Sequence, residues 1–256
     1  MHKMIPAALA LVLAPTLTVT AFGIRAEETP VGAAPHWTYA GATGPEHWGE
    51  LDTAFSTCAS GVNQSPIDIR STLDADLPPL RIRYEGRGTE ILNNGHTIQV
   101  NVAPGSILTL EGTPFELKQF HFHAPSENTV DGESFAMEAQ LVHADAEGHL
   151  AVMGVLYRLG KENQAMAEML AYMPHEAGMK QALLSSIDPA GFLPRVGDYY
   201  RFNGSLTTPP CTEGVRWVVI KEPLAVSKGQ VQAFQAAMHG ANNRPVQEVN
   251  ARPVLR

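Results

Sequence analysis

The chain of 256 residues carries 18 Lys and Arg against 26 Asp and Glu, a formal net charge of −8, and only 17% of its residues are charged. Its 44% of apolar residues can build a packed core, which excludes an intrinsically disordered chain. The acidic balance argues against a nucleic-acid-binding protein, and two cysteines exclude a disulfide-rich mini-protein. The ten histidines are the unusual feature, because histidine is the commonest metal ligand.

Residues 1–26 have the pattern of a secretory signal peptide. A positive start at Lys3 precedes a long apolar run, and the segment contains no acidic residue. Cleavage is expected near Ala21 or Ala26, which leaves residues 27–256 as a single domain. The apolar run has the length of a signal peptide and contains two prolines, so a lasting membrane anchor is not expected. We therefore predict a periplasmic or secreted protein.

Export affects the interpretation of the two cysteines, Cys58 and Cys211. In an oxidising compartment they are expected to form one disulfide bond, which closes a loop across most of the domain. The chain-entropy model gives about 5 kcal/mol for a loop of this length. The alternative is two buried free thiols, since cysteine is also a small buried hydrophobe.

Glycine and proline, at 22 and 19 residues, divide the chain into short segments typical of strands. The predicted strands are Leu80–Tyr84, Ile91–Leu92, Thr97–Val102, Ile107–Leu110, Phe115–His123, Ala136–His143, Leu150–Tyr157 and Val215–Ile220. Helical periodicity occurs in two places, 163–172 and 229–238, and Ser227 is placed to cap the second helix. The sequence therefore predicts a mostly β, single-domain protein with peripheral helices.

The densest candidate site is the segment Gln119-Phe-His-Phe-His123. Alternate residues of a strand share a face, so His121 and His123 project together while Phe120 and Phe122 enter the core. Two imidazoles on one face form half of a zinc site. On its own, so short a motif also fits two histidines on a solvent-facing surface.

Further motifs accompany this pair in order along the chain. They are Trp37-Thr-Tyr-Ala, Gly44-Pro-Glu-His-Trp48, Gln64-Ser-Pro-Ile-Asp-Ile69, Leu92-Asn-Asn-Gly-His96, Ser126-Glu127, Ser205-Leu-Thr-Thr-Pro-Pro-Cys211 and Asn243-Arg-Pro245. With them the sequence resembles the α-class carbonic anhydrases, and specifically their exported bacterial members, from Trp37 nearly to the C-terminus. The resemblance implies a large central twisted, mainly antiparallel sheet. It also implies a zinc-dependent lyase that reversibly hydrates carbon dioxide to bicarbonate and a proton with a zinc-bound hydroxide.

The resemblance assigns the zinc ligands, with one departure from the family pattern. Three histidines bind zinc in this family, and His121 and His123 match the first two. The third ligand belongs to a pattern that is here Glu138-Ala-Gln140-Leu-Val-His143, so Gln140 stands in its place. Strand parity places Glu138 and Gln140 on one face and His143 on the other. A slip of one residue would bring His143 into the site, but we prefer Gln140.

Glutamine can bind zinc through its amide oxygen while its NH₂ group donates to Glu138, which matches the family's partner of the third ligand. An amide oxygen is a weaker zinc ligand than imidazole, so we expect zinc to be held less tightly. Two hypotheses follow. Either a zinc site with Gln140 hydrates carbon dioxide at a reduced rate, or impaired metal binding leaves a carbonic-anhydrase-like binding module. The intact remainder of the site favours the first.

The resemblance also assigns catalytic roles. Thr207 orients the hydroxide and donates to Glu127, which can only accept as an ionised carboxylate. His96 carries protons to buffer, although an exposed histidine in an Asn-Asn-Gly turn is the simpler interpretation of that motif alone. The expected supporting residues are Tyr39, Asn94 and Gln99 for a water chain, Gln119 for His121 and the backbone carbonyl of Asn242 for His123.

Carbon dioxide is apolar and needs an apolar wall beside the metal. The family's substrate pocket is matched by Val142, Val152, Leu206, Val215, Trp217 and Thr208. Taken singly, the apolar members would be interpreted as ordinary core residues. The expected partners are therefore carbon dioxide and bicarbonate, without nucleic acid, and the sequence leaves a homodimer open.

Overall fold

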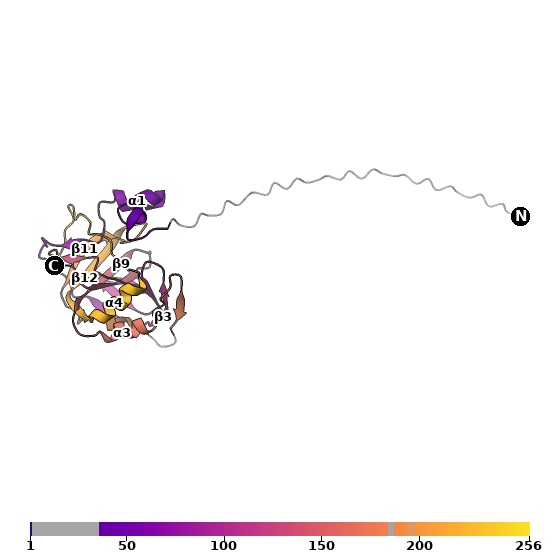
Figure 1. Cartoon of the computed structure of the whole chain (residues 1–256). Helices are drawn as coiled ribbons and strands as arrows, with labels where there is room; N and C mark the ends of the chain where they lie inside the picture. The colour runs from indigo at the N-terminus through magenta and orange to yellow at the C-terminus, as the bar shows by residue number, and fades with distance from the viewer. Residues whose placement is uncertain (2–35, 184–186, 196) are drawn as a thin grey trace. The chain divides into compact units, whose positions relative to one another are not determined.

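The computed structural model describes Met1 and residues 36–183, 187–195 and 197–256. From His36 onward the described residues belong to one compact unit (Figure 1). The predicted signal peptide, residues 1–26, and its cleavage site lie outside the described residues apart from Met1. Within the described part of the chain, no helix combines the length and the apolar character needed to cross a bilayer.

Strands dominate the fold, as the sequence predicts. They are β1 (Asp68–Ile69), β2 (Arg81–Arg83), β3 (Gly88–Asn93), β4 (Ile98–Val102), β5 (Ile107–Leu110), β6 (Thr113–His123), β7 (Thr129–Val130), β8 (Met137–Ala144), β9 (Leu150–Leu159), β10 (Lys180–Ala182), β11 (Tyr199–Ser205) and β12 (Glu213–Val226). The helices are α1 (Trp48–Leu51), α2 (Thr57–Ser60), α3 (Gln164–Ala171) and α4 (Lys228–Ala237), with 3₁₀ turns η1 (Gly41–Thr43), η2 (Thr53–Phe55) and η3 (Pro189–Phe192).

Ten of the described strands form one sheet, whose main path is β10-β3-β4-β6-β8-β9-β12-β11. Strands β2 and β5 extend it from the side of β6, and β1 pairs with β7 in a separate two-stranded sheet. Every described pair in the large sheet is antiparallel except β9 with β12. The predicted class, a mostly β fold on a large and mainly antiparallel sheet, is therefore confirmed.

Strand β11 was not predicted from the sequence. Its residues include Arg201 and Asn203, which interrupt the apolar pattern. Arg201 is nevertheless buried, because its guanidinium donates to the carboxylate of Glu111 and to the carbonyl oxygen of Phe202. Short elements such as α1 and α2 were missed for another reason, since a single helical turn is too short to display a period.

Two helices cover one face of the sheet, and Figure 1 shows α3 and α4 side by side. The N-terminus of α4 has the predicted cap: the hydroxyl of Ser227 accepts from Gln230 N, and Gln230 Oε1 accepts from Ser227 N. The same Gln230 amide exchanges hydrogen bonds with the backbone of Asn163, which caps α3. One glutamine thus ties the starts of both helices together.

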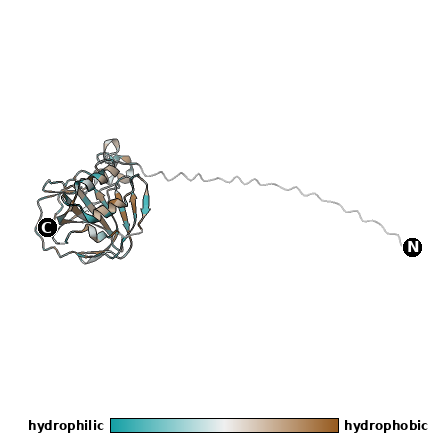
Figure 2. Ribbon diagram, turned by 60° about the horizontal axis from the view of Figure 1, so that its bottom comes forward, coloured by the Kyte–Doolittle hydropathy of each residue, from teal (hydrophilic) through white to brown (hydrophobic). Residues whose placement is uncertain are grey.

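The faces of β6 explain where the site lies. A bulge in the pairing of β6 with β8, between Leu117 and Gln119, reverses the alternation of side chains. Leu117, Phe120 and Phe122 therefore all enter the core beneath α3 and α4. Figure 2 shows apolar and hydrophilic segments succeeding each other along the strands. After the bulge, the odd-numbered residues of β6 project from the opposite face of the sheet.

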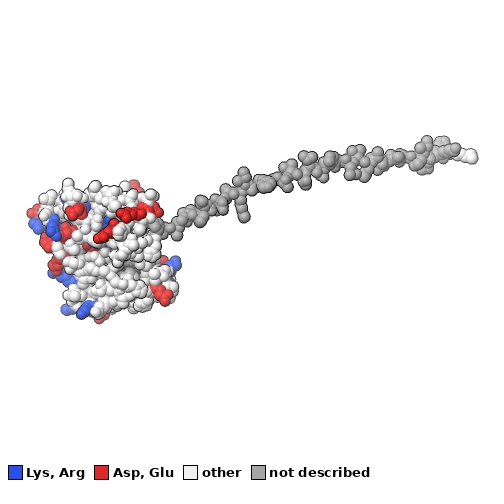
Figure 3. Space-filling model, turned by 45° about the horizontal axis from the view of Figure 1, so that its top comes forward, with Lys and Arg blue, Asp and Glu red and all other residues white. Residues whose placement is uncertain are grey.

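The surface carries few charges. On the face drawn in Figure 3, acidic and basic side chains are dispersed among mostly uncharged atoms. This agrees with the charged fraction of 17%. Such a face has no continuous basic stripe of the kind that binds a phosphate backbone.

Candidate active site

The site is built on the histidine pair of β6. Each ring is anchored through Nδ1: His121 Nδ1 donates to Gln119 Oε1 at 2.9 Å, and His123 Nδ1 donates to the carbonyl oxygen of Asn242 at 2.6 Å. The ring centroids lie 5.1 Å apart. A neutral imidazole that carries its proton on Nδ1 has a lone pair on Nε2. The two Nδ1 anchors therefore leave the Nε2 atom of each ring with a lone pair that could bind a metal ion.

The protonation of both rings agrees with that role. Loss of hydration, with the neighbouring ring of His123 as a second cause, lowers the pKa of His121 to about 3. Loss of hydration likewise lowers the pKa of His123 to about 4, although its bond to Asn242 opposes the shift. Both rings are therefore neutral at pH 7. The Nε2 atom of His123 is buried without a hydrogen-bond partner among the described residues, as expected of a metal ligand.

Gln140 lies beside the histidine pair. On β8 it pairs directly with His121, and its side chain is buried beside that ring. Its Nε2 donates to Glu127 Oε2 at 2.8 Å. The structure places His143 on the opposite face, where its Nε2 accepts from the hydroxyl of Tyr84 at 2.6 Å. The strand register thus brings Gln140, and not His143, beside the histidine pair.

The expected contact between Gln140 and Glu138 is not formed, and this expectation is corrected. Glu138 is directed instead at the backbone that follows β6. Its Oε2 accepts from the N–H groups of Glu127 and Asn128 at 2.9 and 2.8 Å, and its Oε1 accepts from Asn128 Nδ2 at 2.7 Å. Three donors therefore occupy the Glu138 carboxylate, and the Gln140 amide turns to Glu127.

Glu127 is the acceptor around which the site is organised. Its Oε1 accepts from the backbone N–H of Arg244 at 2.8 Å, its Oε2 accepts from Gln140, and the hydroxyl of Thr207 also donates to it. Burial raises its pKa to about 7, while these hydrogen bonds act in the opposite direction. The three donors favour the ionised form, and burial favours the protonated form.

The apolar residues matched to the substrate pocket lie in one cluster, which does not include Thr208. Val152, Val215 and Trp217 are buried in it. Val142 and Leu206 are half-buried and pack against them. Register explains the assembly, since Val142 pairs with Val152 and Val152 pairs with Trp217 across three neighbouring strands. An apolar wall therefore adjoins the histidine pair on the same face of the sheet.

The loop after β11 carries Thr207 and Thr208 and is fixed at both ends. The carbonyl of Thr208 accepts from Cys211 N at 2.8 Å, and Leu206 N donates to the carbonyl of Thr212 at 2.9 Å. Cys211 forms the predicted disulfide bond with Cys58, with 5.0 Å between their Cα atoms. The bridge therefore ties this loop to the helical segment near the start of the domain.

His96 lies apart from the histidine pair, in the turn between β3 and β4. It is half-buried, and its ring is stacked on Trp37. Loss of hydration and the nearby His36 lower its pKa. The side chain of Asn94, expected to order water, accepts from the backbone N–H groups of His96 and Thr97 and so shapes the turn.

The other two residues expected to order water lie in different settings. Gln99 donates through Nε2 to Asn101 Oδ1 at 2.7 Å. The hydroxyl of Tyr39 is buried and has no hydrogen-bond partner among the described residues. Burial and the negative charge of Glu127 raise the pKa of Tyr39, which therefore stays protonated.

Three residues that contact the site residues were not predicted from the sequence to do so. Arg244, in the quoted motif Asn243-Arg-Pro245, is fully buried, and its guanidinium donates to Gln64 Oε1 and to the carbonyls of Ser65 and Cys58. Asn128 occupies the carboxylate of Glu138, and Trp37 stacks on His96. Motif position could have indicated Arg244 and Trp37, since both belong to quoted motifs, but nothing in the sequence indicates the contact of Asn128.

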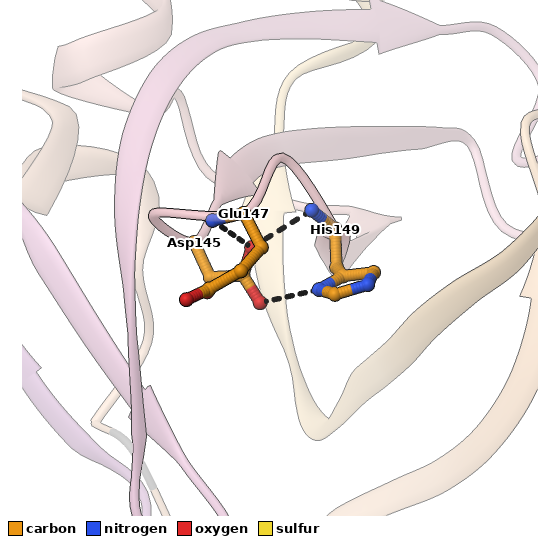
Figure 4. A group of neighbouring side chains, drawn as sticks. All are labelled: Asp145, Glu147 and His149. Carbon is orange, nitrogen blue, oxygen red and sulfur yellow. Dashed lines mark hydrogen bonds and ion pairs between the residues drawn. The ribbon is translucent and has the colours of Figure 1, made fainter.

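A second cluster of potential metal ligands lies in the turn between β8 and β9. It consists of Asp145, Glu147 and His149 (Figure 4). Asp145 Oδ1 accepts from the backbone N–H groups of Glu147 and His149, and Asp145 Oδ2 accepts from His149 Nδ1 at 2.9 Å. These bonds stabilise a tight turn and use both oxygens of the central carboxylate.

The fold and site define a class of protein: a β-sheet protein with a pair of anchored, neutral histidines on the face of its sheet opposite the helices α3 and α4. Residues 43–256 match the eukaryotic-type carbonic anhydrase family, and the chain belongs to this family. A carbonic anhydrase of Klebsiella pneumoniae is 47% identical over 224 residues, which are 87% of this chain and 91% of that protein.

Solved structures give the same result. The α-carbonic anhydrase of Thermovibrio ammonificans, in complex with the inhibitor sulfanilamide, is 47% identical with a TM-score of 0.85. The alignment covers 88% of this chain and all of that one. The Photobacterium profundum α-carbonic anhydrase is 51% identical with a TM-score of 0.82, over 86% of this chain and all of that one.

Proposed function

We propose that the protein catalyses the reversible hydration of carbon dioxide to bicarbonate and a proton, with a zinc ion held by His121, His123 and Gln140. The histidine pair carries this proposal: two neutral imidazoles have their Nδ1 atoms anchored. The Nε2 atom of His123 is buried without a hydrogen-bond partner among the described residues, 3.4 Å from Glu127 Oε2. The amide oxygen of Gln140 supplies the third ligand. Zinc, when bound, lowers the pKa of water to about 7 and so supplies hydroxide at neutral pH.

Thr207 and Glu127 orient the nucleophile. Because the Glu127 carboxylate only accepts, the hydroxyl proton of Thr207 points to it. The oxygen of Thr207 is then left to accept a hydrogen bond from a nucleophile beside it. A hydroxide supplied by bound zinc would be oriented by this bond, with a lone pair toward the substrate carbon, as the addition requires.

The apolar cluster binds carbon dioxide beside this nucleophile. Val142 and Leu206 form the half-buried part of its wall, and Trp217 lies beneath them. Thr208, which is half-buried, would contact the substrate from the same loop as Thr207. An apolar substrate gains from leaving water here, whereas the charged product bicarbonate does not, which favours its release.

His96 carries the proton produced by each turnover to buffer. An imidazole suits this task because it gains and loses a proton near neutral pH. It is half-buried, so one side of the ring reaches solvent. The proton passes from the site through ordered water, for which the buried hydroxyl of Tyr39 is a hydrogen-bonding partner.

Gln140 sets the strength of the metal site. An amide oxygen is a weaker ligand for zinc than imidazole, so zinc dissociates more readily than from a site with three histidines. We expect an active enzyme whose occupancy, and with it the rate per chain, depends on the free zinc concentration.

The location that fits this assignment is the periplasm or the extracellular space. The disulfide bond between Cys58 and Cys211 supports it, because such bonds persist in oxidising compartments. The signal peptide over residues 1–26 and the homodimer both stay predictions from sequence.

The test combines activity with metal content. The protein is purified in zinc-replete buffer, its zinc is counted per chain, and carbon dioxide hydration is followed by stopped flow with a pH indicator. We expect near-stoichiometric zinc and hydration that a chelator abolishes, and His121→Ala should lack both. Less than about a tenth of an equivalent of zinc in the wild-type protein would refute the proposal.

A further inference from the structure

We propose that Glu127 is a positioning residue for the metal ligand Gln140, so that one carboxylate orients both the third ligand and the hydroxyl of Thr207. This inference rests on the proposed function, since it concerns how the same site holds zinc. It differs from the expectation drawn from sequence, in which Glu138 was to orient the third ligand.

The need for a positioning residue follows from the chemistry of an amide. Its two ends have nearly the same shape but opposite character, because the oxygen binds a cation and the NH₂ group repels one. Rotation by half a turn about the last side-chain bond of Gln140 would exchange them. A ligand of this kind needs a neighbour that distinguishes its ends, whereas either nitrogen of an imidazole can serve as a ligand.

Glu127 makes that distinction. Gln140 Nε2 donates to Glu127 Oε2 at 2.8 Å, and an ionised carboxylate can only accept. The NH₂ end is therefore held at Glu127 while the other end of the amide is left to His121 and the metal. Gln140 and Glu127 are 2% and 1% exposed, so water does not compete for this bond.

Glu138 is excluded from this role by its other contacts. Two backbone N–H groups and the amide of Asn128 already donate to it, at distances of 2.7 to 2.9 Å. These bonds hold the segment that carries Glu127, because one of the two N–H groups belongs to Glu127 itself. Glu138 thus supports Glu127, and Glu127 in turn orients Gln140.

Glu127 is itself fixed strongly enough to act in this way. Its Oε1 accepts from the backbone N–H of Arg244 at 2.8 Å. The side chain of Arg244 is anchored to Gln64 Oε1 and to the carbonyls of Ser65 and Cys58. The carboxylate therefore cannot rotate to follow a reoriented amide without losing other bonds.

The test is a double-mutant cycle read by zinc affinity. The variants are Glu127→Gln, Gln140→Ala and the combination of both. Arg244 N–H and the Gln140 NH₂ group donate to different oxygens of Glu127, so the NH₂ group of a glutamine there would face one of these donors. Zinc dissociation constants are measured by competition with a chromophoric chelator, without reference to activity. Circular dichroism establishes that each variant is folded.

Glu127→Gln should weaken zinc binding about 10–100-fold when Gln140 is present, the usual effect of losing the partner of a metal ligand. The same substitution should weaken binding several-fold less when position 140 is already alanine. Loss of the negative charge near the ion acts in both backgrounds, so the cycle subtracts it. Equal effects in the two backgrounds would overturn the inference.

A second substitution covers the case in which Glu127→Gln does not fold. Glu127→Asp keeps the charge but withdraws the carboxylate from Gln140. It should therefore also weaken zinc binding more in the protein that has Gln140 than in the Gln140→Ala variant. If the wild-type protein binds zinc and hydrates carbon dioxide but the cycle shows no coupling between positions 127 and 140, only this inference is overturned. Wild-type protein that binds no zinc would overturn the proposed function as well.

Discussion

The indole of Trp37 stacks on the imidazole of His96, with ring centroids 3.6 Å apart and ring planes 7° apart. The stack joins the first described segment of the domain to the turn between β3 and β4. It holds the proposed proton carrier in one orientation at the half-buried edge of the site.

His96→Ala should slow carbon dioxide hydration by about 10-fold or more when buffer is scarce, because proton transfer to solvent then limits turnover. Ample imidazole buffer should restore the rate. The measurement is stopped-flow hydration over a range of buffer concentrations, with the exposed His149→Ala as control. An equal loss at every buffer concentration would show that His96 has another role.

Gln140→Ala should lower the amount of zinc retained after dialysis, whereas His143→Ala should retain as much as the wild-type protein. The reason is their placement on opposite faces of β8, with His143 bonded to Tyr84. His143→Ala should instead lower the free energy of unfolding by about 1–3 kcal/mol, because it leaves a buried hydroxyl unpaired. Zinc analysis and chemical denaturation separate the two effects, and the reverse pattern would contradict the register of β8.

His143 should also contribute a pH dependence to stability. Burial lowers its pKa to about 4 from an ordinary value of 6.5, so at pH 5 it is protonated in the unfolded chain but neutral in the folded one. The unfolded state then binds more protons, and stability falls as pH decreases below 6.5. Between pH 7 and pH 5 this loss amounts to about 2 kcal/mol.

The measurement for this prediction compares His143→Gln with the wild-type protein. Glutamine does not titrate but can form hydrogen bonds with the same partners. The stability advantage of the wild-type protein should therefore shrink by about 2 kcal/mol between pH 7 and pH 5. A constant difference over this range would mean that His143 does not resist protonation in the folded state.

Loss of the Cys58–Cys211 bridge should lower the free energy of unfolding by about 2–5 kcal/mol. The double substitution Cys58→Ser and Cys211→Ser tests this by denaturation in urea. Reduced wild-type protein serves as the control and should unfold at the same urea concentration as the double variant. Unchanged stability in both would show that the contacts of Arg244 and Gln64 hold this segment without the bridge.

Sequence alone determined the class of fold and the identity of the histidine pair. Alternation along 119–123 predicts that His121 and His123 share a face while Phe120 and Phe122 are buried, and the structure has this arrangement. Helix capping by Ser227 is equally local. Such features depend on residues close together in the chain, so periodicity and motif spacing reveal them.

Tertiary structure alone decided the hydrogen bonds of the buried carboxylates. Glu127 and Glu138 compete for donors that come from four parts of the chain, including Asn128, Gln140 and Arg244. Buried polar groups need hydrogen-bond partners, and all of them must be satisfied in the same structure. Which donor each acceptor receives therefore depends on distances that only the assembled sheet sets. For this reason the sequence could place Gln140 in the site but assigned its amide to the wrong glutamate.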